Sequence, residues 1–262
     1  MNRALRTAAT GMAAQQLNVD LISNNLSNVN TTGFKKSRPE FKDLMYQTIK
    51  ASGLSEDGRT KESTEIQVGN GTMPGAVVKS FLQGDIQPTN NPLDLAIQGD
   101  GFIQVQRPDG TTAYTRDGSL KISGDGQLVT SEGYIVQPSI SFSSDTQSVT
   151  IARDGTIEAT EVGQTTSTKV GQLELAKFVN PGGLRAIGNN LYVETIASGK
   201  PIQGAAGSEG FGELIQGSLE ASNVDVVEEM VSMIVAQRAY EINSKTIKTV
   251  EDMLTMANNL QR

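Results

Sequence analysis

The first thirty residues carry apolar side chains at alternating intervals of three and four. The positions are Met1, Leu5, Ala8, Met12, Val19, Ile22, Leu26 and Val29, with Gln15 in the one gap. This spacing has a period of 3.5 residues, and it predicts a helix with the apolar seam of a coiled coil. Leu17 and Leu21 widen the seam on one flank, and Gly33 is the expected stop.

The last forty residues repeat this pattern. Their stripe runs through Val226, Met230, Met233, Ala236, Tyr240, Asn243, Ile247, Val250, Leu254 and Ala257. Asn223 or Asp225 is suited to cap the start, and Glu228 and Glu229 lie where the helix dipole favours acids. A second apolar flank near the start consists of Val227, Val231, Ile234 and Val235. A helix that is apolar on more than one side usually contacts more than one neighbour.

Two interpretations of these helices are open. They can pair only with each other or lie on the central domain. Alternatively, they form an antiparallel pair whose remaining apolar flank is buried by other subunits. Each segment would extend about 45–55 Å at 1.5 Å per residue, which is long for a helix that covers one small β domain. This length favours the second interpretation.

Between the helices the pattern changes to short β-type runs. From Ala76 to about Gly212, runs such as VVKSFL, GFIQVQ and GQLELAKFV alternate with turns. Asp-Gly pairs, which favour turns with positive φ, occur at 100–101, 109–110, 117–118, 125–126 and 154–155. They predict successive hairpins. Residues 51–75 are polar and rich in Gly, Ser and Thr, and they predict an extended connector.

These patterns together predict an α+β fold. Long N- and C-terminal α-helices pair as a coiled-coil-like domain, and a central all-β domain of antiparallel hairpins lies between them in the sequence. The expected parts are residues 1–34 with 219–262 as the helical domain, 35–75 as the extended connector and 76–218 as the central β domain.

Composition removes most catalytic and metal chemistry. The 262 residues contain no Cys and no His, so disulfides, thiolate zinc sites and nucleophiles activated by His are excluded. No phosphate-binding loop occurs, the glycines at 69–75 have the wrong spacing for a dinucleotide fingerprint, and the calcium nonapeptide is missing. We therefore expect no catalytic residues, no metal and no cofactor, although a carboxylate pair assembled across the β domain stays open.

Charge and hydropathy limit the partners. The net charge of −7 argues against nucleic acid. Basic side chains gather at Lys35, Lys36 and Arg38, which we interpret as a solvated face. No apolar run approaches the roughly 20 residues of a membrane span, so no membrane insertion is expected. The first residues also lack the continuous apolar run of a cleaved signal peptide.

An asparagine cluster marks the second half of the first helix. It consists of Asn18, Asn24, Asn25, Asn28 and Asn30. Asn is a poor helix former and needs hydrogen-bond partners when it is buried. The cluster is therefore either a frayed helix end with capping asparagines, or a set of hydrogen bonds that fixes register across a packed helical interface.

Three long stretches resemble the flagellar axial proteins of the rod and hook. They are SNNLSNVNTTGFKKSRPEF at 23–41, the block from QGDIQPTNNPLDL to SEGY at 83–134, and the block from LEASNVDVVEEM to VEDML at 219–254. Within this family, 262 residues leave no room for the extra outer domain of a hook subunit. The stretches at 43–50 and 180–202 are similar to distal rod subunits, and proximal rod or hook-type axial proteins are the alternatives.

The resemblance implies a structural subunit of the distal rod and not an enzyme. Such subunits leave unfolded through the flagellar type III export channel, without a cleaved signal. They then assemble helically into a hollow drive shaft that crosses the periplasm. The shaft belongs to the flagellar basal body, transmits torque from motor to hook and conducts exported subunits. The implied partners are copies of the chain, proximal rod proteins, the hook protein, the L- and P-ring bushing, the export apparatus and the rod cap. The alternative from another class is a secreted β-domain adhesin or glycan-active enzyme.

The expected subunit interface combines the helical seams with residues of the matching stretches. It comprises Leu5, Met12, Val19, Ile22, Asn24, Asn25, Leu26, Asn28, Val29, Gly33, Phe34, Val226, Met230, Met233, Ile234, Gln237, Arg238, Tyr240, Asn243, Ile247, Val250 and Leu254.

Overall fold

The computed structural model describes residues 2–50, 53–54, 61–62, 65–163 and 166–260. The chain divides into two compact units. Unit 1 contains residues 1–26, 37–78 and 226–262, and unit 2 contains residues 27–36 and 79–225. Parts of the predicted connector, at 51–52, 55–60 and 63–64, lie outside the described residues.

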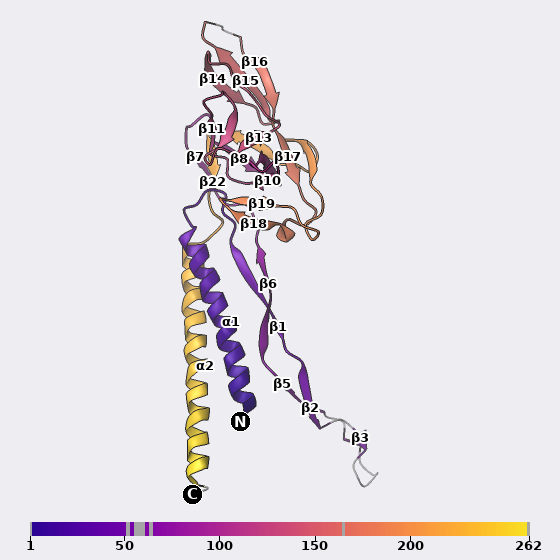
Figure 1. The fold of residues 1–262 in the computed structure, drawn as a ribbon, viewed down its shortest axis with the longest axis vertical. Helices are drawn as coiled ribbons and strands as arrows, with labels where there is room; N and C mark the ends of the chain where they lie inside the picture. Colours follow the sequence, from indigo (N-terminus) through magenta and orange to yellow (C-terminus); the bar gives the residue numbers. More distant parts are fainter. Residues whose placement is uncertain (1, 51–52, 55–60, 63–64, 164–165, 261–262) are drawn as a thin grey trace. The chain divides into compact units, whose positions relative to one another are not determined.

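Two long helices dominate unit 1, α1 (Asn2–Ser27) and α2 (Val226–Leu260). They lie side by side (Figure 1). Asn25 of α1 is hydrogen-bonded to Glu229 of α2, and a Cβ atom at Gly11 would lie 3.0 Å from Asn243. Both contacts fit one antiparallel register, since a step from 25 to 11 along α1 matches the step from 229 to 243 along α2. The predicted pairing of the terminal helices is confirmed.

The remainder of unit 1 is an arm, which we define as residues 37–78. Its strands pair as nested sets: β1 (Ser37–Asp43) with β6 (Thr72–Lys79), β2 (Tyr46–Lys50) with β5 (Ile66–Gly69), and β3 (Gly53–Leu54) with β4 (Lys61–Glu62). The arm contacts α1, because Arg3 donates a hydrogen bond to Gln47 at 2.5 Å and the Thr72 N–H donates to Thr10 at 3.4 Å. The stretch expected to be an extended connector therefore contains paired strands.

Unit 2 is built from short strands, and its paired strands run antiparallel to each other. The strands are β7 (Ile86–Pro88), β8 (Leu95–Gln98), β9 (Phe102–Gln106), β10 (Thr112–Thr115), β11 (Leu120–Ile122), β12 (Leu128–Thr130), β13 (Ile135–Gln137), β14 (Thr146–Ile151), β15 (Thr156–Glu161), β16 (Thr168–Gln172), β17 (Glu174–Lys177), β18 (Arg185–Gly188), β19 (Leu191–Val193), β20 (Ile202–Ala205), β21 (Glu213–Gln216) and β22 (Ser218–Glu220). A short 3-10 helix, η1 (Pro181–Gly183), precedes β18. The central antiparallel β domain, and with it the α+β fold class, is confirmed.

The main sheet of unit 2 has nine strands. Seven follow the order β11-β12-β13-β9-β10-β19-β18, β17 also pairs with β9, and β20 pairs with β17. A separate sheet, β14-β15-β16, lies at one end of the unit (Figure 1). Side chains from both sheets, among them Val105, Ile157 and Leu175, are fully buried in one apolar core.

The Asp-Gly turns are hairpins at three of the five predicted positions. Residues 109–110, 125–126 and 154–155 connect the paired strands β9–β10, β11–β12 and β14–β15, and all three glycines have positive φ. The prediction is wrong at 100–101 and 117–118, where the flanking strands pair with other partners. At Gly118 the requirement is space, because a Cβ atom there would overlap the carbonyl oxygen of Leu95.

Candidate functional site: the junction cluster and the uncovered face of α2

Within the described part of the chain, no group of three His, Cys, Asp or Glu side chains could hold a metal ion. None of the described helices has an apolar stretch long enough to cross a membrane. The features that stand out are a buried ionic cluster in unit 2 and an exposed apolar face on α2.

One face of α2 packs on α1. Ala236 and Val250 are buried on it, and Met233, Asn243, Ile247 and Leu254 are partly buried, at the three- and four-residue spacing of the predicted stripe. At the start of the helix the buried residue is Glu229, whereas Val226 and Met230 are exposed. The carboxylate of Glu229 accepts a hydrogen bond from Asn25 at 3.2 Å, which explains why an acid occupies the seam.

The opposite face of α2 is apolar and uncovered. It consists of Val227, Val231, Ile234, Val235 and Ile242, each more than half exposed. At 3.6 residues per turn, Val227, Val231 and Ile234 lie about half a turn away from the seam with α1, and Val235 and Ile242 lie about a third of a turn away. Further along the helix the same face becomes polar, at Arg238, Lys245 and Thr249. Exposed apolar surface of this extent on a soluble protein marks a contact surface.

Asn25 acts within its own chain. Its amide nitrogen donates to the Ser37 carbonyl at 3.0 Å, and its oxygen accepts from the Ser37 N–H at 2.9 Å. Together with the bond to Glu229, these contacts tie α1, the start of the arm and α2 at one point in unit 1. Among the other asparagines of the cluster, Asn24 is exposed and Asn28 is partly buried.

A buried ionic cluster in unit 2 joins the two chain segments that follow α1 and precede α2 in the sequence. We call residues 27–36 and 219–225 the junction segments, and Lys35, Arg116 and Glu220 the junction cluster. Glu220 accepts from Lys35 at 2.5 Å and from Arg116 at 2.9 Å. The exposed fractions of the three side chains are 0%, 4% and 1% in sequence order. The interpretation of Lys35 as part of a solvated face is therefore wrong.

Backbone groups complete the cluster. Lys35 also donates to the Leu82 carbonyl at 2.7 Å, Arg116 donates to the Gly99 carbonyl, and the Gly84 N–H donates to Glu220 at 2.9 Å. Buried charges are tolerated when hydrogen bonds satisfy them in this way. The Nε of Arg116 has no partner among the described residues. The charged side chains of the cluster are two cations and one carboxylate, so positive charge is in excess.

Burial and charge oppose each other in this cluster. Burial lowers the pKa of Lys35, and the Glu220 carboxylate offsets part of that effect. For Glu220, burial favours the neutral acid, but Arg116 and Lys35 together outweigh it and hold the pKa below the ordinary value of 4.5. Glu220 is therefore an ionised anchor at neutral pH.

A second set of hydrogen bonds joins the junction segments directly. The Lys36 N–H donates to the side chain of Asn223 at 2.8 Å, and the Asn223 amide donates to the carbonyls of Ser80 and Leu82. The Gly33 N–H donates to the Glu220 carbonyl at 2.8 Å. Asn223 thus fastens one junction segment to the other. Of the two cap candidates proposed from the sequence, Asp225 is the residue that directly precedes α2.

An aromatic cluster lies beside the junction. Phe81, Phe102, Tyr114, Phe178 and Tyr192 meet edge to face, with ring centroids 4.8 to 6.1 Å apart. Arg116 lies 5.7 Å from the Phe102 centroid, and Lys79 lies 4.9 Å from that of Phe34. Burial raises the pKa of the Tyr192 phenol to about 12. Through Arg116 and Phe102, the aromatic cluster borders the ionic cluster.

The residues expected at the subunit interface fall into three groups. Ile22, Asn25, Gly33, Phe34 and Val250 are buried within the chain, and Leu5, Met12, Val19, Leu26, Asn28, Val29, Met233, Asn243, Ile247 and Leu254 are partly buried. The exposed members are Asn24, Val226, Met230, Ile234, Gln237, Arg238 and Tyr240. The exposed group has the largest share of its surface available to another chain, and Ile234 belongs to the uncovered face of α2.

Sequence reasoning did not find the junction cluster. Arg116 and Glu220 were not singled out, and no local signal pairs them, because 104 residues separate them. The available signal was indirect. Lys35, Arg116 and Glu220 each lie in a different one of the three stretches that carried the family resemblance.

Family models match the same three parts of the chain. They are described as "Flagella basal body rod protein" over residues 5–35, "Flagellar hook protein FlgE/F/G D1 domain" over 96–159, and "Flagellar basal body rod FlgEFG protein C-terminal" over 215–260. The first includes Lys35, the second Arg116 and the third Glu220.

Full-length relatives decide the family. The flagellar basal-body rod protein FlgG of Borreliella burgdorferi is 54% identical over 100% of both chains. The chain belongs to the flagellar basal-body rod protein family. Rod proteins of the same name from Caulobacter vibrioides and Buchnera aphidicola are 50% and 48% identical, over at least 98% of each chain.

Membership of the flagellar basal-body rod family settles the broad function. The chain is a structural protein of the flagellar basal body and not an enzyme. It is a subunit of the rod, which assembles with other rod and hook components. The junction cluster and the two faces of α2 are thus features of a structural part and not of a catalytic site.

Proposed function

We propose that the chain is the subunit of the distal rod, a hollow shaft that crosses the periplasm and transmits torque from motor to hook. Copies of the chain assemble helically, and exported subunits pass through the bore. The observation that carries this proposal is the uncovered apolar face of α2, opposite the face that packs on α1.

The physical reason is that one chain cannot bury both faces of its own helix. Burial of a Val or Ile side chain contributes roughly 1.5–3 kcal/mol relative to exposure. Val227, Val231, Ile234, Val235 and Ile242 therefore provide a strong driving force for association. A helix that is packed on two sides also resists sliding and rotation, since packed interfaces have few alternative arrangements. Resistance of this kind is what a torque-bearing shaft needs.

The partners follow from a place between motor and hook. We propose that the subunit contacts copies of itself, proximal rod proteins below and the hook protein above, with the L- and P-ring bushing around it. The export apparatus and the rod cap handle it before assembly, and it is exported through the type III channel without a cleaved signal. A place in the proximal rod or as a hook-type axial protein is the alternative. The resemblance of residues 43–50 and 180–202 to distal rod subunits favours the distal position.

The test removes the uncovered face while keeping the helix. The triple variant Val227→Ser/Val231→Ser/Ile234→Ser is compared with the control Val162→Ser/Val179→Ser/Ile196→Ser, which changes the same residue types at three positions in unit 2 that are on average more exposed. Sedimentation and electron microscopy of concentrated protein report polymer. We expect the control to form tubes like the wild type and the triple variant to stay monomeric with unchanged helix content. Equal polymer formation by both variants would refute the role of this face.

A further inference from the structure

Unit 2 contains a groove whose lining is basic, although the chain as a whole is acidic. The groove has a volume of about 790 Å³, and its lining includes Arg107, Tyr114, Arg185, Glu194, Lys200 and Gln203. The three cations come from three separate segments: the turn after β9, the start of β18 and the loop before β20. They outnumber the single carboxylate of the lining in a chain with 22 basic and 29 acidic residues.

Two of these cations are available to a partner. Arg107 is paired with Asp109 at 2.9 Å. Within the described residues, neither Arg185 nor Lys200 has an ion-pair partner, and both side chains are exposed. Three like charges around one concavity repel each other, and an acidic partner would relieve that repulsion.

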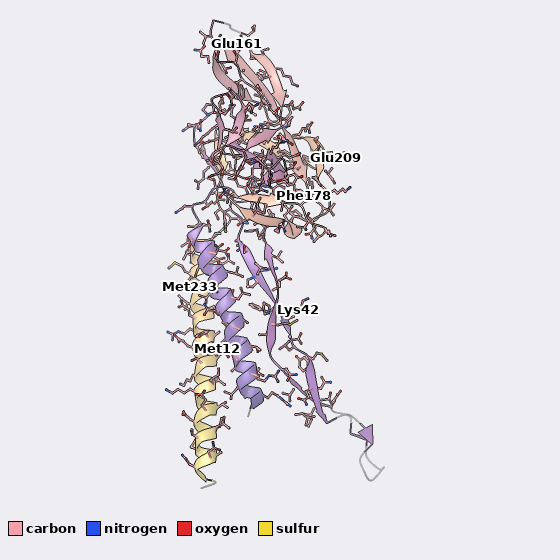
Figure 2. The ribbon with its side chains drawn as sticks, viewed as in Figure 1. Met12, Lys42, Glu161, Phe178, Glu209 and Met233 are labelled. Atoms are coloured by element: carbon pink, nitrogen blue, oxygen red, sulfur yellow. The ribbon has the colours of Figure 1, made fainter. Side chains whose placement is uncertain are left out.

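The same unit carries acidic side chains at its far end. Asp145 directly precedes β14 and is exposed, and Glu161, which lies opposite Thr146 in the sheet, is partly buried. We call these two carboxylates the acidic tip. Figure 2 shows Glu161 at the extreme end of unit 2. Glu158 accepts a hydrogen bond from Ser167 at 2.7 Å and lies opposite Lys169, so it does not belong to the tip. The tip therefore has two carboxylates, which match the two exposed cations of the groove.

The two surfaces lie at different ends of unit 2. Strands β18 and β19, which border the groove, are at the end away from β14, β15 and β16 (Figure 1). A groove and a tip of one unit placed in this way cannot meet within the same chain. They can meet between copies. A contact between two different surfaces of identical chains is head to tail, and it generates an open helical polymer when its rotation does not close into a ring.

We propose that the basic groove of one copy binds the acidic tip of a second copy. This contact rests on the proposed assembly of the chain and adds to it a specific electrostatic contact between β units. The apolar face of α2 supplies non-directional attraction. The groove and tip supply direction, because complementary charges fix register and exclude wrong alignments.

Charge reversal with rescue tests the pairing. Arg185→Glu/Lys200→Glu reverses the groove, and Asp145→Lys/Glu161→Lys reverses the tip. We expect each double variant to raise the critical concentration for polymer formation by about tenfold or more, because like charges then face each other. The chain that carries all four changes should recover a critical concentration near that of the wild type. The control Lys42→Glu/Lys121→Glu changes the net charge by the same amount as the groove variant, at exposed positions elsewhere, and should polymerise normally.

The outcomes separate this inference from the proposed function. If the wild-type chain forms no polymer under any condition, helical self-assembly itself is wrong. If the wild type polymerises and the groove reversal has no effect, or if the fourfold variant is not rescued, the groove–tip pairing alone is wrong. Loss with the groove reversal but not with the tip reversal would assign the groove to an acidic partner other than a second copy.

Cross-linking provides a second measurement that does not depend on charge. Because the chain has no Cys, Arg185→Cys and Glu161→Cys each introduce a single thiol. After assembly of an equal mixture and mild oxidation, we expect disulfide-linked dimers that contain one chain of each kind. A mixture of Lys121→Cys with Glu161→Cys should give none. Equal yields from the two mixtures would overturn the proposed contact.

Discussion

Glu220→Gln is the most informative single change, because it removes the only carboxylate of the junction cluster and keeps the shape of the side chain. Lys35 and Arg116, 0% and 4% exposed, would then be two buried cations without a counter-charge. The Gln amide group would also direct donor hydrogens toward Lys35, Arg116 and the Gly84 N–H, which all donate to the Glu220 carboxylate.

The magnitude follows from the burial. Breaking a buried ion pair by removing one partner costs about 3–5 kcal/mol, and here one carboxylate serves two cations. We therefore expect a loss of at least about 3 kcal/mol in the free energy of unfolding. That is more than a hundredfold in the folding equilibrium, since about 1.4 kcal/mol is tenfold. It is also a large part of the roughly 5–15 kcal/mol that a domain has.

Urea-induced unfolding of the full chain, followed by circular dichroism, measures this loss. Amide exchange at Gly33 and Gly84, whose N–H groups bond to Glu220, shows whether the loss begins at the junction. The matched control is Glu213→Gln, since Glu213 pairs with Arg153 at 3.6 Å and its side chain is half exposed. The control should change stability by about 0.5 kcal/mol or less.

Lys35→Met sharpens the test. It leaves Glu220 with Arg116 as a matched pair, and the Gly84 N–H still bonds to the carboxylate. Because cations are in excess in the cluster, we expect this variant to lose less than about half as much stability as Glu220→Gln. A loss below about 1 kcal/mol for Glu220→Gln, or a larger loss for Lys35→Met, would refute the assignment of Glu220 as the anchor.

Three other predictions concern the same region and the helix pair. The pKa of the Glu220 carboxylate lies below 4.5 in the folded chain. The stabilisation of the folded chain by this carboxylate is therefore complete above pH 4.5 and is lost as the pH falls through the folded-state pKa. The melting temperature of the wild type should fall more steeply below pH 4.5 than that of Glu220→Gln. Gly33→Ala should destabilise the chain by clearly more than Gly110→Ala, because a Cβ atom at Gly33 would lie 2.8 Å from the Arg116 backbone, whereas a Cβ atom at Gly110 would meet open space. For Gly110→Ala we expect only the cost of a left-handed backbone for Ala, about 1–2 kcal/mol. Equal losses of stability in thermal unfolding would contradict this prediction. Asn25→Asp places a second carboxylate beside Glu229 and should speed amide exchange over residues 22–26 at pH 7, whereas Asn24→Asp, at an exposed position, should not.

The helices could be predicted because their signal is local. A stripe such as Met233, Ala236, Ile247 and Val250 recurs every three or four residues, and neighbours within one element determine it. The hairpin at 109–110 is local for the same reason. The arm gave a weaker signal. Its strands have side chains exposed at most described positions, so no alternation of apolar and polar residues marks them.

The junction cluster could not be predicted because its parts are distant in the sequence. In the sequence, Lys35 lies beside Lys36 and close to Arg38, and such a basic group is usually exposed to solvent. Only the fold brings Glu220 to Lys35. The asparagine cluster was noticed, but its two meanings could not be separated. The hydrogen bonds of Asn25 with Ser37 and Glu229 show that this residue connects α1 to the arm and to α2 within one chain.

The separation of these contacts along the chain also sets the order of folding. Lys35 meets Glu220 across 185 residues, and Asn25 meets Glu229 across 204. Contacts of this range form slowly, because a long loop must close before any of them is gained. Until Glu220 is present, closing the site around Lys35 and Arg116 would bury two cations without a counter-charge, which opposes early collapse. A chain delivered from its N-terminus therefore stays open at the junction until about the last sixth of it arrives, and the joining of its two ends is the late step of folding.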